Sequence, residues 1–78
     1  MKTYTVELSN LLPSGDPGAR IARASFLAEE STPLRDLIPA AKEAIGIRPS
    51  AKTRQVKIRN LIEIRFPSSA GLIAYLES

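Results

Sequence analysis

Two segments near the N-terminus alternate apolar and polar residues, as half-buried β-strands do. In residues 3–9 the even-numbered positions are apolar, and residues 20–28 continue the alternation more weakly. Between them, residues 10–19 are rich in Pro, Gly, Asn and Asp, which are the residue types that form turns. The pattern predicts an antiparallel hairpin.

The side chains of this hairpin favour one register, in which the numbers of paired residues sum to 30. It sets large residues opposite small ones on the inner face and opposite charges on the outer face. The pairs are Leu8 with Ala22, Val6 with Ala24, Tyr4 with Phe26 and, outside, Glu7 with Arg23. Such pairs contribute roughly 0.2–1 kcal/mol each, whereas a slip by one residue moves every side chain to the wrong face.

The segment after the hairpin has the spacing of an amphipathic helix. Thr32 and Pro33 are typical of a helix start, with Thr32 as the cap, and Gly46 of a helix end. Apolar residues recur between them at Leu34, Leu37, Ile38, Ala41 and Ile45. Pro39 lacks the N–H that an inner helical turn needs, which leaves two alternatives. Either a kinked helix runs through Pro39, or Asp36 caps a later helix with Pro39 in its first turn.

Residues 54–66 again carry aliphatic residues at even positions, interrupted by Asn60. They form either one bulged strand or, as the charges favour, a hairpin centred on residue 60. The hairpin pairs Val56 with Ile64 and Ile58 with Ile62 on the inner face, and Lys57 with Glu63 on the outer face.

The C-terminal segment is compatible with a helix or a strand. Residues 70–77 are interpreted as a short helix capped by Ser68 that buries Leu72, Ile73 and Leu76, and the alternative is a strand over 72–76. We therefore predict a single α+β domain over residues 1–78. It is a two-layer sandwich in which two helices cover one face of an antiparallel sheet of three to four strands, in the order ββαββα or ββαβα.

Positive charge is concentrated in the second half of the chain. Residues 48–65 contain six cations and one acid, which gives +5, whereas the remaining five cations and seven acids give −2. We expect much of this charge on the sheet face turned away from the helices, among aliphatic residues. The expected members of that face are Thr3, Thr5, Glu7, Ile21, Arg23, Ser25, Leu27, Gln55, Lys57, Leu61, Glu63 and Arg65.

Cations around aliphatic patches suit a protein partner. The candidate partner-binding residues are Arg54, Lys57, Arg59, Arg65, Arg48, Lys52 and Arg23. We expect a small non-catalytic binding module that regulates or inhibits a larger acidic protein or nucleoprotein by stoichiometric contact, as prokaryotic or phage-encoded regulators do. The contact is expected on the outer sheet face or the 10–19 loop, and exposed aliphatic residues or a free sheet edge also allow a homodimer.

The alternative is a nucleic-acid-binding protein whose cations in residues 48–65 contact phosphates, which gives salt-sensitive and largely non-specific binding. Recognition by base stacking is not expected, because it needs exposed aromatic rings. All four aromatic residues fall on predicted inner positions: Tyr4, Phe26, Phe66 and Tyr75.

The composition argues against catalysis. Cys and His are absent, which removes disulfides, the usual general base near neutral pH and the commonest zinc and haem ligands. The carboxylates show no metal-binding spacing, so we expect no metal, no cofactor and no enzymatic activity. Residues 1–12 alternate instead of forming an apolar signal segment, and no apolar run could span a membrane, so we expect a cytoplasmic protein without membrane contact.

The predicted ββα opening is followed by a short motif at the helix end, Gly46-Ile47-Arg48-Pro49. Together with Thr32-Pro33-Leu34-Arg35-Asp36-Leu37, it resembles a ubiquitin-type β-grasp domain over roughly residues 3–58. The resemblance implies a helix packed after a hairpin. It does not imply conjugation or sulfur transfer, because Leu76-Glu77-Ser78 stands where that family has a diglycine.

Overall fold

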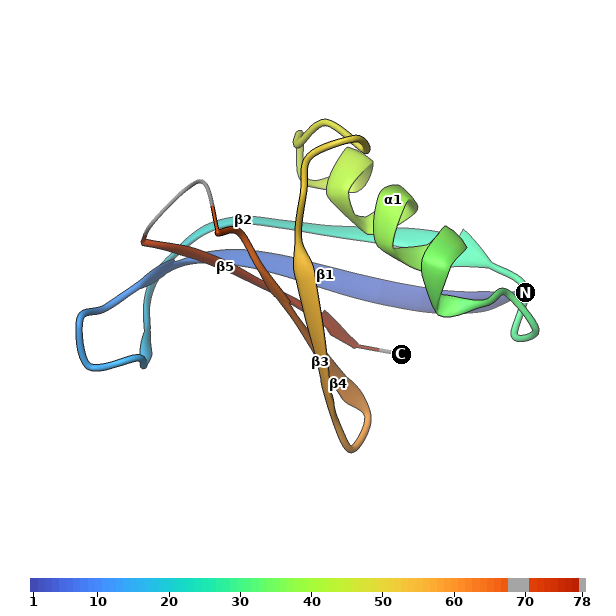
Figure 1. Cartoon of the computed structure of the whole chain (residues 1–78). Helices are drawn as coiled ribbons and strands as arrows, with labels where there is room; N and C mark the ends of the chain where they lie inside the picture. Colours follow the sequence, from blue (N-terminus) through green and yellow to red (C-terminus); the bar gives the residue numbers. More distant parts are fainter. Residues whose placement is uncertain (68–70, 78) are drawn as a thin grey trace.

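Within residues 1–67 and 71–77, which the structure describes, five antiparallel strands form one sheet and a helix lies across one face (Figure 1). The structure is a computed structural model. The elements are β1 (Lys2–Leu11), β2 (Pro17–Ala28), α1 (Leu34–Ala44), β3 (Arg54–Ile58), β4 (Leu61–Arg65) and β5 (Leu72–Glu77). The order across the sheet is β2-β1-β5-β4-β3, which places the C-terminal strand at the centre.

The predicted sandwich with two helices on one face is wrong. The order of elements is ββαβββ, because residues 72–77 form β5 instead of the second helix. β5 pairs with β1 on one side and with β4 on the other, so that backbone groups on both of its edges find partners. A helix at this position would leave the facing edges of β1 and β4 without a strand between them. The predicted cap Ser68 lies outside the described residues.

The first hairpin has the predicted register. Leu8 pairs with Ala22, Val6 with Ala24, Tyr4 with Phe26 and Glu7 with Arg23. The Tyr4 and Phe26 rings stack with their centroids 5.6 Å apart. The register then shifts twice towards the turn, so that Ser9 pairs with Arg20 and not with Ile21.

α1 runs through Pro39 as one helix, as the first of the two alternatives predicted. Its start differs from that prediction. Pro33 occupies the N-cap position with extended backbone, and no side chain makes a capping hydrogen bond. Neither Thr32 nor Asp36 is therefore the cap.

The end of α1 confirms Gly46 as the stop. Gly46 has a φ of +81°, a left-handed conformation that favours glycine. The N–H of Gly46 donates to the carbonyl of Glu43, and the N–H of Ile47 donates to the carbonyl of Lys42. This double hydrogen bond is the Schellman arrangement, which turns the chain away from the helix.

The hydrophobic core lies between α1 and the sheet face that carries it, which we call the helix face. Leu37, Ile38 and Ala41 of α1 are buried there. They cover a sheet surface made of Tyr4, Val6, Leu8, Ile64, Phe66, Ala74 and Leu76. α1 contacts β1 and β2, and the β3–β4 hairpin extends away from it (Figure 1).

β3 and β4 form a hairpin, but the predicted register is wrong by one residue. Arg59 and Asn60 form the turn. The observed pairs are Arg54 with Arg65, Gln55 with Ile64, Val56 with Glu63, Lys57 with Ile62 and Ile58 with Leu61. Because side chains alternate along a strand, Gln55 and Lys57 lie on the helix face and Val56 and Ile58 on the opposite face.

The turn and the position of β3 explain this register. Two-residue turns are the commonest hairpin connections, whereas a turn centred on residue 60 would include Leu61, a poor turn residue. β3 is also an edge strand, and α1 packs mainly on β2 and β1, so the helix face of β3 offers little core to fill. Val56 and Ile58 consequently remain 41% and 47% exposed.

Candidate functional site

The seven predicted partner-binding cations do not share one surface. Arg23, Arg54 and Arg65 lie on the face opposite the helix, whereas Lys57 lies on the helix face. Arg59 is in the β3–β4 turn, and Arg48 and Lys52 are exposed in the loop between α1 and β3. The expectation that Gln55 and Lys57 face away from the helix is wrong because of the one-residue register shift.

Acidic residues neutralise much of the charge on the opposite face. Oε1 of Glu7 lies 3.4 Å from Nη1 of Arg20 and 3.3 Å from Nε of Arg23. Nη2 of Arg65 donates a hydrogen bond of 3.1 Å to Oε2 of Glu63. These exposed arginines gain little stability from the pairs, but the pairs lower the positive potential of this face.

Tyr75 lies on the same face, between Glu7 and Glu63 on the neighbouring strands. The prediction that all four aromatic residues point inward is therefore wrong for Tyr75, because its segment is a strand. Burial raises the pKa of Tyr75, the charge of Glu63 raises it further, and Arg65 acts in the opposite direction. Because the Tyr75 ring lies between two carboxylates, which repel the phosphates of a nucleic acid, it is poorly placed to stack on a base.

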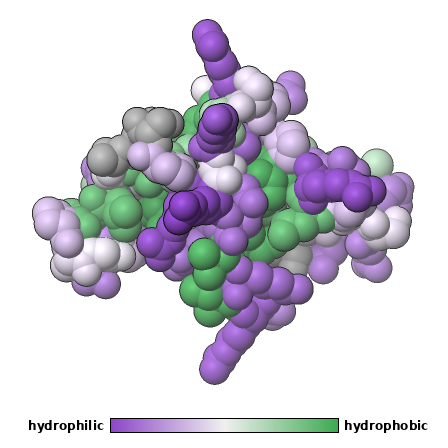
Figure 2. Space-filling view, viewed as in Figure 1, coloured by the Kyte–Doolittle hydropathy of each residue, from purple (hydrophilic) through white to green (hydrophobic). Residues whose placement is uncertain are grey.

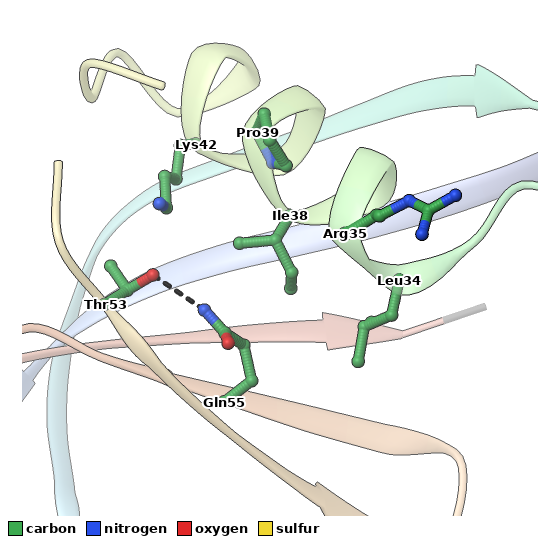
Figure 3. Close-up of a pocket in the computed structure, with 7 residues that line it drawn as sticks. All are labelled: Leu34, Arg35, Ile38, Pro39, Lys42, Thr53 and Gln55. Atoms are coloured by element: carbon green, nitrogen blue, oxygen red, sulfur yellow. Dashed lines mark hydrogen bonds between the residues drawn. The ribbon is translucent and has the colours of Figure 1, made fainter. Parts of the chain in front are cut away.

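The helix face has a hollow of about 430 Å³ between α1 and the start of β3. Its lining residues are Leu34, Arg35, Ile38, Pro39, Lys42, Thr53 and Gln55 (Figure 3). Leu34 and Ile38 point from the helix towards β3, and Nε2 of Gln55 donates a 2.7 Å hydrogen bond to Oγ1 of Thr53 (Figure 3). The guanidinium of Arg35 extends away from Gln55 (Figure 3). The lining of this hollow is mixed, with Leu34, Ile38 and Pro39 beside the polar Thr53 and Gln55 and the cations Arg35 and Lys42.

Lys42 holds the loop that leads into β3. Its side chain is 6% exposed, and Nζ donates hydrogen bonds to the carbonyl oxygens of Ala51 at 2.7 Å and Pro49 at 3.4 Å. Its ammonium group is thus engaged within the chain. Lys42 positions the groove and is not offered as a ligand contact.

A second hollow of about 170 Å³ follows along β3 towards the turn. Its lining residues are Lys2, Tyr4, Lys57, Arg59, Asn60, Ile62 and Leu76. Nζ of Lys2 lies 5.8 Å from the centroid of the Tyr4 ring. No acidic residue lines either hollow, and within residues 1–67 and 71–77 Lys2, Lys57 and Arg59 form no ion pair. We call the two hollows together the basic groove.

The backbone at Arg59 supports a functional interpretation of this end of the groove. Its φ is 56°, in the left-handed region, at the first central position of the turn. A non-glycine residue there costs about 1–2 kcal/mol relative to the right-handed conformation, and glycine would avoid this cost. Strain of this kind is often retained where a side chain has a function.

Aliphatic side chains flank the basic groove on the other side of β3. Val56 and Ile58 are exposed, and Ile58 also borders a hollow at the hairpin tip that Arg59, Leu61 and the acidic Glu77 line as well. Figure 2 shows hydrophobic surface beside strongly hydrophilic projections over the β3–β4 hairpin. β3 thus presents Lys57 on the helix face, and Arg54, Val56 and Ile58 on the opposite face.

Sequence reasoning missed Lys2, Arg35 and Lys42. Lys2 and Arg35 carry no local signal, because their place beside β3 depends on how distant elements pack. Lys42 did carry one: it follows Ile38 by four residues, so it lies on the buried side of the helix. A lysine at such a position must find acceptors.

Among the residues that the structure describes, no cluster of three or more Asp, Glu, His or Cys residues could hold a metal ion. In the same residues, no helix has the length and apolar character needed to cross a membrane.

No protein-family model matches this chain, and searches of curated proteins and of solved structures found no significantly similar protein. The basic groove and the edge strand beside it are therefore interpreted from their own geometry.

Proposed function

We propose that this protein is a non-catalytic binding module that regulates or inhibits an acidic partner protein by stoichiometric contact through the basic groove. One observation carries the proposal. Lys2, Lys57 and Arg59 line one hollow whose lining contains no acidic residue, and Val56 and Ile58 are exposed on the other face of the same strand. Opposite charge on a partner gives specificity and fast association, and the aliphatic groups supply area to bury.

A protein partner fits this surface better than a nucleic acid does. The aromatic ring in the groove belongs to Tyr4, which is 7% exposed and stacks on Phe26, so it has no free face for a base. Exposed aliphatic residues beside cations are typical of protein interfaces. A chain without Cys is compatible with a partner in the reducing cytoplasm.

Phosphate binding is the second candidate, and the same three cations favour it. Cations that line one hollow without an acidic residue in that lining would also attract a nucleic-acid backbone. The two candidates differ in their dependence on salt.

The test compares two variants with the same change of charge. The groove variant carries Lys57→Glu and Arg59→Glu, and the control carries Arg48→Glu and Lys52→Glu in the exposed loop. Partners are captured from nuclease-treated extract of cells that produce the protein, and a purified partner is titrated by calorimetry. We expect the groove variant to lose at least about tenfold in affinity and the loop variant to stay within about threefold.

Two results would contradict the proposal. If both variants bind the partner as tightly as the unmodified protein, the groove is not the contact. If the unmodified protein binds generic single-stranded RNA or duplex DNA, loses orders of magnitude in affinity between about 50 and 200 mM salt, and the groove variant does not bind, the phosphate candidate is correct.

A further inference from the structure

β3 is the more open of the two sheet edges. Within the described residues it pairs with β4 alone, and all five of its residues are exposed. Its pairing with β4 has no register shift, whereas β2 at the other edge contains two shifts and packs against α1. Bulges and covering elements protect a sheet edge, and β3 has neither. Its unpaired backbone groups form a regular template for another strand.

The side chains of β3 specify what that strand would contain. Gln55 and Lys57 lie on the helix face, and Arg59 follows in the turn, whereas Val56 and Ile58 lie on the opposite face with Arg54 at the start of the strand. Residues directly opposite each other on neighbouring strands have Cβ atoms about 4.5–5.5 Å apart, within reach for ion pairs and apolar contacts. A matching strand therefore alternates acidic residues on the helix face with aliphatic residues on the opposite face.

Charge distinguishes this partner from a second copy of the chain. Residues 54–59 contain three cations and no acid. Two copies of β3 side by side would bring four cations onto adjacent strands, with Arg59 of each copy in the turn that follows and no carboxylate in either segment. Like charges that lie directly opposite each other on paired strands are destabilising. An acidic strand would instead neutralise Lys57 and Arg59.

We propose that the partner contributes an extended segment of alternating acidic and aliphatic residues, which pairs with β3 as a sixth strand beside the basic groove. This inference rests on the proposed function and specifies the kind of partner. Strand addition of this type obtains affinity from main-chain hydrogen bonds and specificity from the alternate side chains.

The test uses three synthetic peptides with capped ends. The first alternates Glu with Val and Ile over eight residues, the second has the same residues with the four Glu grouped at one end, and the third is the first with N-methylated backbone amides. Affinity is measured by NMR titration of the full chain, together with hydrogen exchange of the β3 amides. We expect the alternating peptide to bind, to protect β3 amides from exchange, and to exceed each control at least about tenfold in affinity.

A charge exchange adds an independent readout. The groove variant with Lys57→Glu and Arg59→Glu should no longer bind the alternating Glu peptide. It should bind an otherwise identical peptide with Lys in place of Glu. The loop variant with Arg48→Glu and Lys52→Glu should keep the original preference. The same NMR spectra check that the loop variant keeps its fold.

The outcomes separate this inference from the proposed function. If all three Glu peptides bind equally well and the groove variant binds none of them, strand addition is overturned and the basic groove remains the contact. Failure of the alternating peptide to bind at 1 mM would also overturn strand addition, while the captured partner tests the groove separately. Sedimentation that shows a dimer with protected β3 amides would replace the acidic segment by a second copy. Tighter binding of single-stranded nucleic acid than of the peptide, at the same amides, would replace it by a nucleic acid.

Discussion

The ammonium group of Lys42 lies inside the protein, on a helix face that is otherwise apolar. A buried charge is tolerated where polar atoms solvate it, and the carbonyls of Pro49 and Ala51 do so here. The same two hydrogen bonds tie the 48–53 loop to α1. Lys42 therefore links α1 to the loop that leads into β3, and it also lines the first hollow.

Lys42→Met tests this role. Methionine fills similar space but leaves the two carbonyls without their charged donor, so we expect a loss of about 1.5–3 kcal/mol in the free energy of unfolding. Urea denaturation measures the loss. The matched change Lys52→Met, at an exposed position of the same loop, should stay within about 0.5 kcal/mol. Equal stability of the two variants would mean that the carbonyls of the loop do not need Lys42.

Tyr75 gives the opposite face a pH dependence. Its pKa is raised above the ordinary 10.0, first by burial and then by Glu63. The folded protein therefore holds the phenol proton more tightly than the unfolded chain does. This contribution to stability is complete below the unfolded pKa of about 10 and is lost as the pH rises through the folded value.

The titration of Tyr75 can be measured directly. Tyrosinate absorbance of the unmodified protein minus that of Tyr75→Phe gives the Tyr75 curve, and we expect its midpoint above 10.0 in the folded protein. Glu63→Gln should lower this midpoint by removing a negative charge. The same subtraction in concentrated urea supplies the ordinary value. A folded midpoint equal to the urea value would exclude burial of this phenol.

Among the elements, the β3–β4 hairpin shows how weakly an edge strand is specified. In the first hairpin, large and small side chains on the core face and Glu7 with Arg23 on the other face all agree on one register. In the second, the core constrains β4 alone, through residues such as the fully buried Ile64. β3 can then follow the preferred two-residue turn at a small loss of apolar burial.

The turn itself can be tested by Arg59→Gly. Glycine removes the cost of the left-handed conformation but gains entropy in the unfolded chain, so we expect a net gain of up to about 1 kcal/mol in stability. Thermal or urea unfolding measures this gain, and binding of the acidic partner should weaken in the same variant. Asn60→Gly is the control, because Asn60 has no positive φ and should gain nothing. Loss of stability in Arg59→Gly would contradict the proposed strain.

At the scale of the whole molecule, the central place of β5 is the decisive feature. β5 joins the N-terminal hairpin to the β3–β4 hairpin, because it pairs with β1 and with β4. Its helix-face residues Ala74 and Leu76 are at most 1% exposed. The two halves of the sheet have no other strand between them in the described residues.

Deletion of residues 71–78 should therefore abolish the cooperative fold. We expect the NMR amide spectrum to lose its dispersion, since the truncated chain would expose the facing edges of β1 and β4. Addition of a peptide with the sequence of residues 71–78 should restore the spectrum, as a donated strand does in other sheets. A dispersed spectrum of the truncated chain by itself would contradict the central role of β5.

The seven predicted cations show how far sequence reasoning reached towards the site. Lys57 and Arg59 were predicted as partner-binding residues and now line the basic groove, but Lys57 was assigned to the wrong face. A shift of the β3–β4 register by one residue leaves the composition and alternation of β3 unchanged but moves each of its side chains to the other face of the sheet. The alternation alone therefore does not determine the face on which Lys57 lies. Lys2 joins them from the opposite end of the chain, a proximity that no local pattern encodes.

The sequence by itself determined the register of the first hairpin and the stop of the helix at Gly46, because each rests on neighbours in the chain or on agreement between two faces. It left two alternatives at Pro39, and the structure selected the helix that runs through it. The sequence also determined the excess of positive charge between residues 48 and 65. Only the tertiary structure decided that residues 72–77 are a strand, because a helix and a strand both place Leu72 and Leu76 on the same face. The strand is selected by its pairing with β1 on one side and β4 on the other. The tertiary structure likewise decided which cations remain without an acidic neighbour, because that depends on which strands lie side by side.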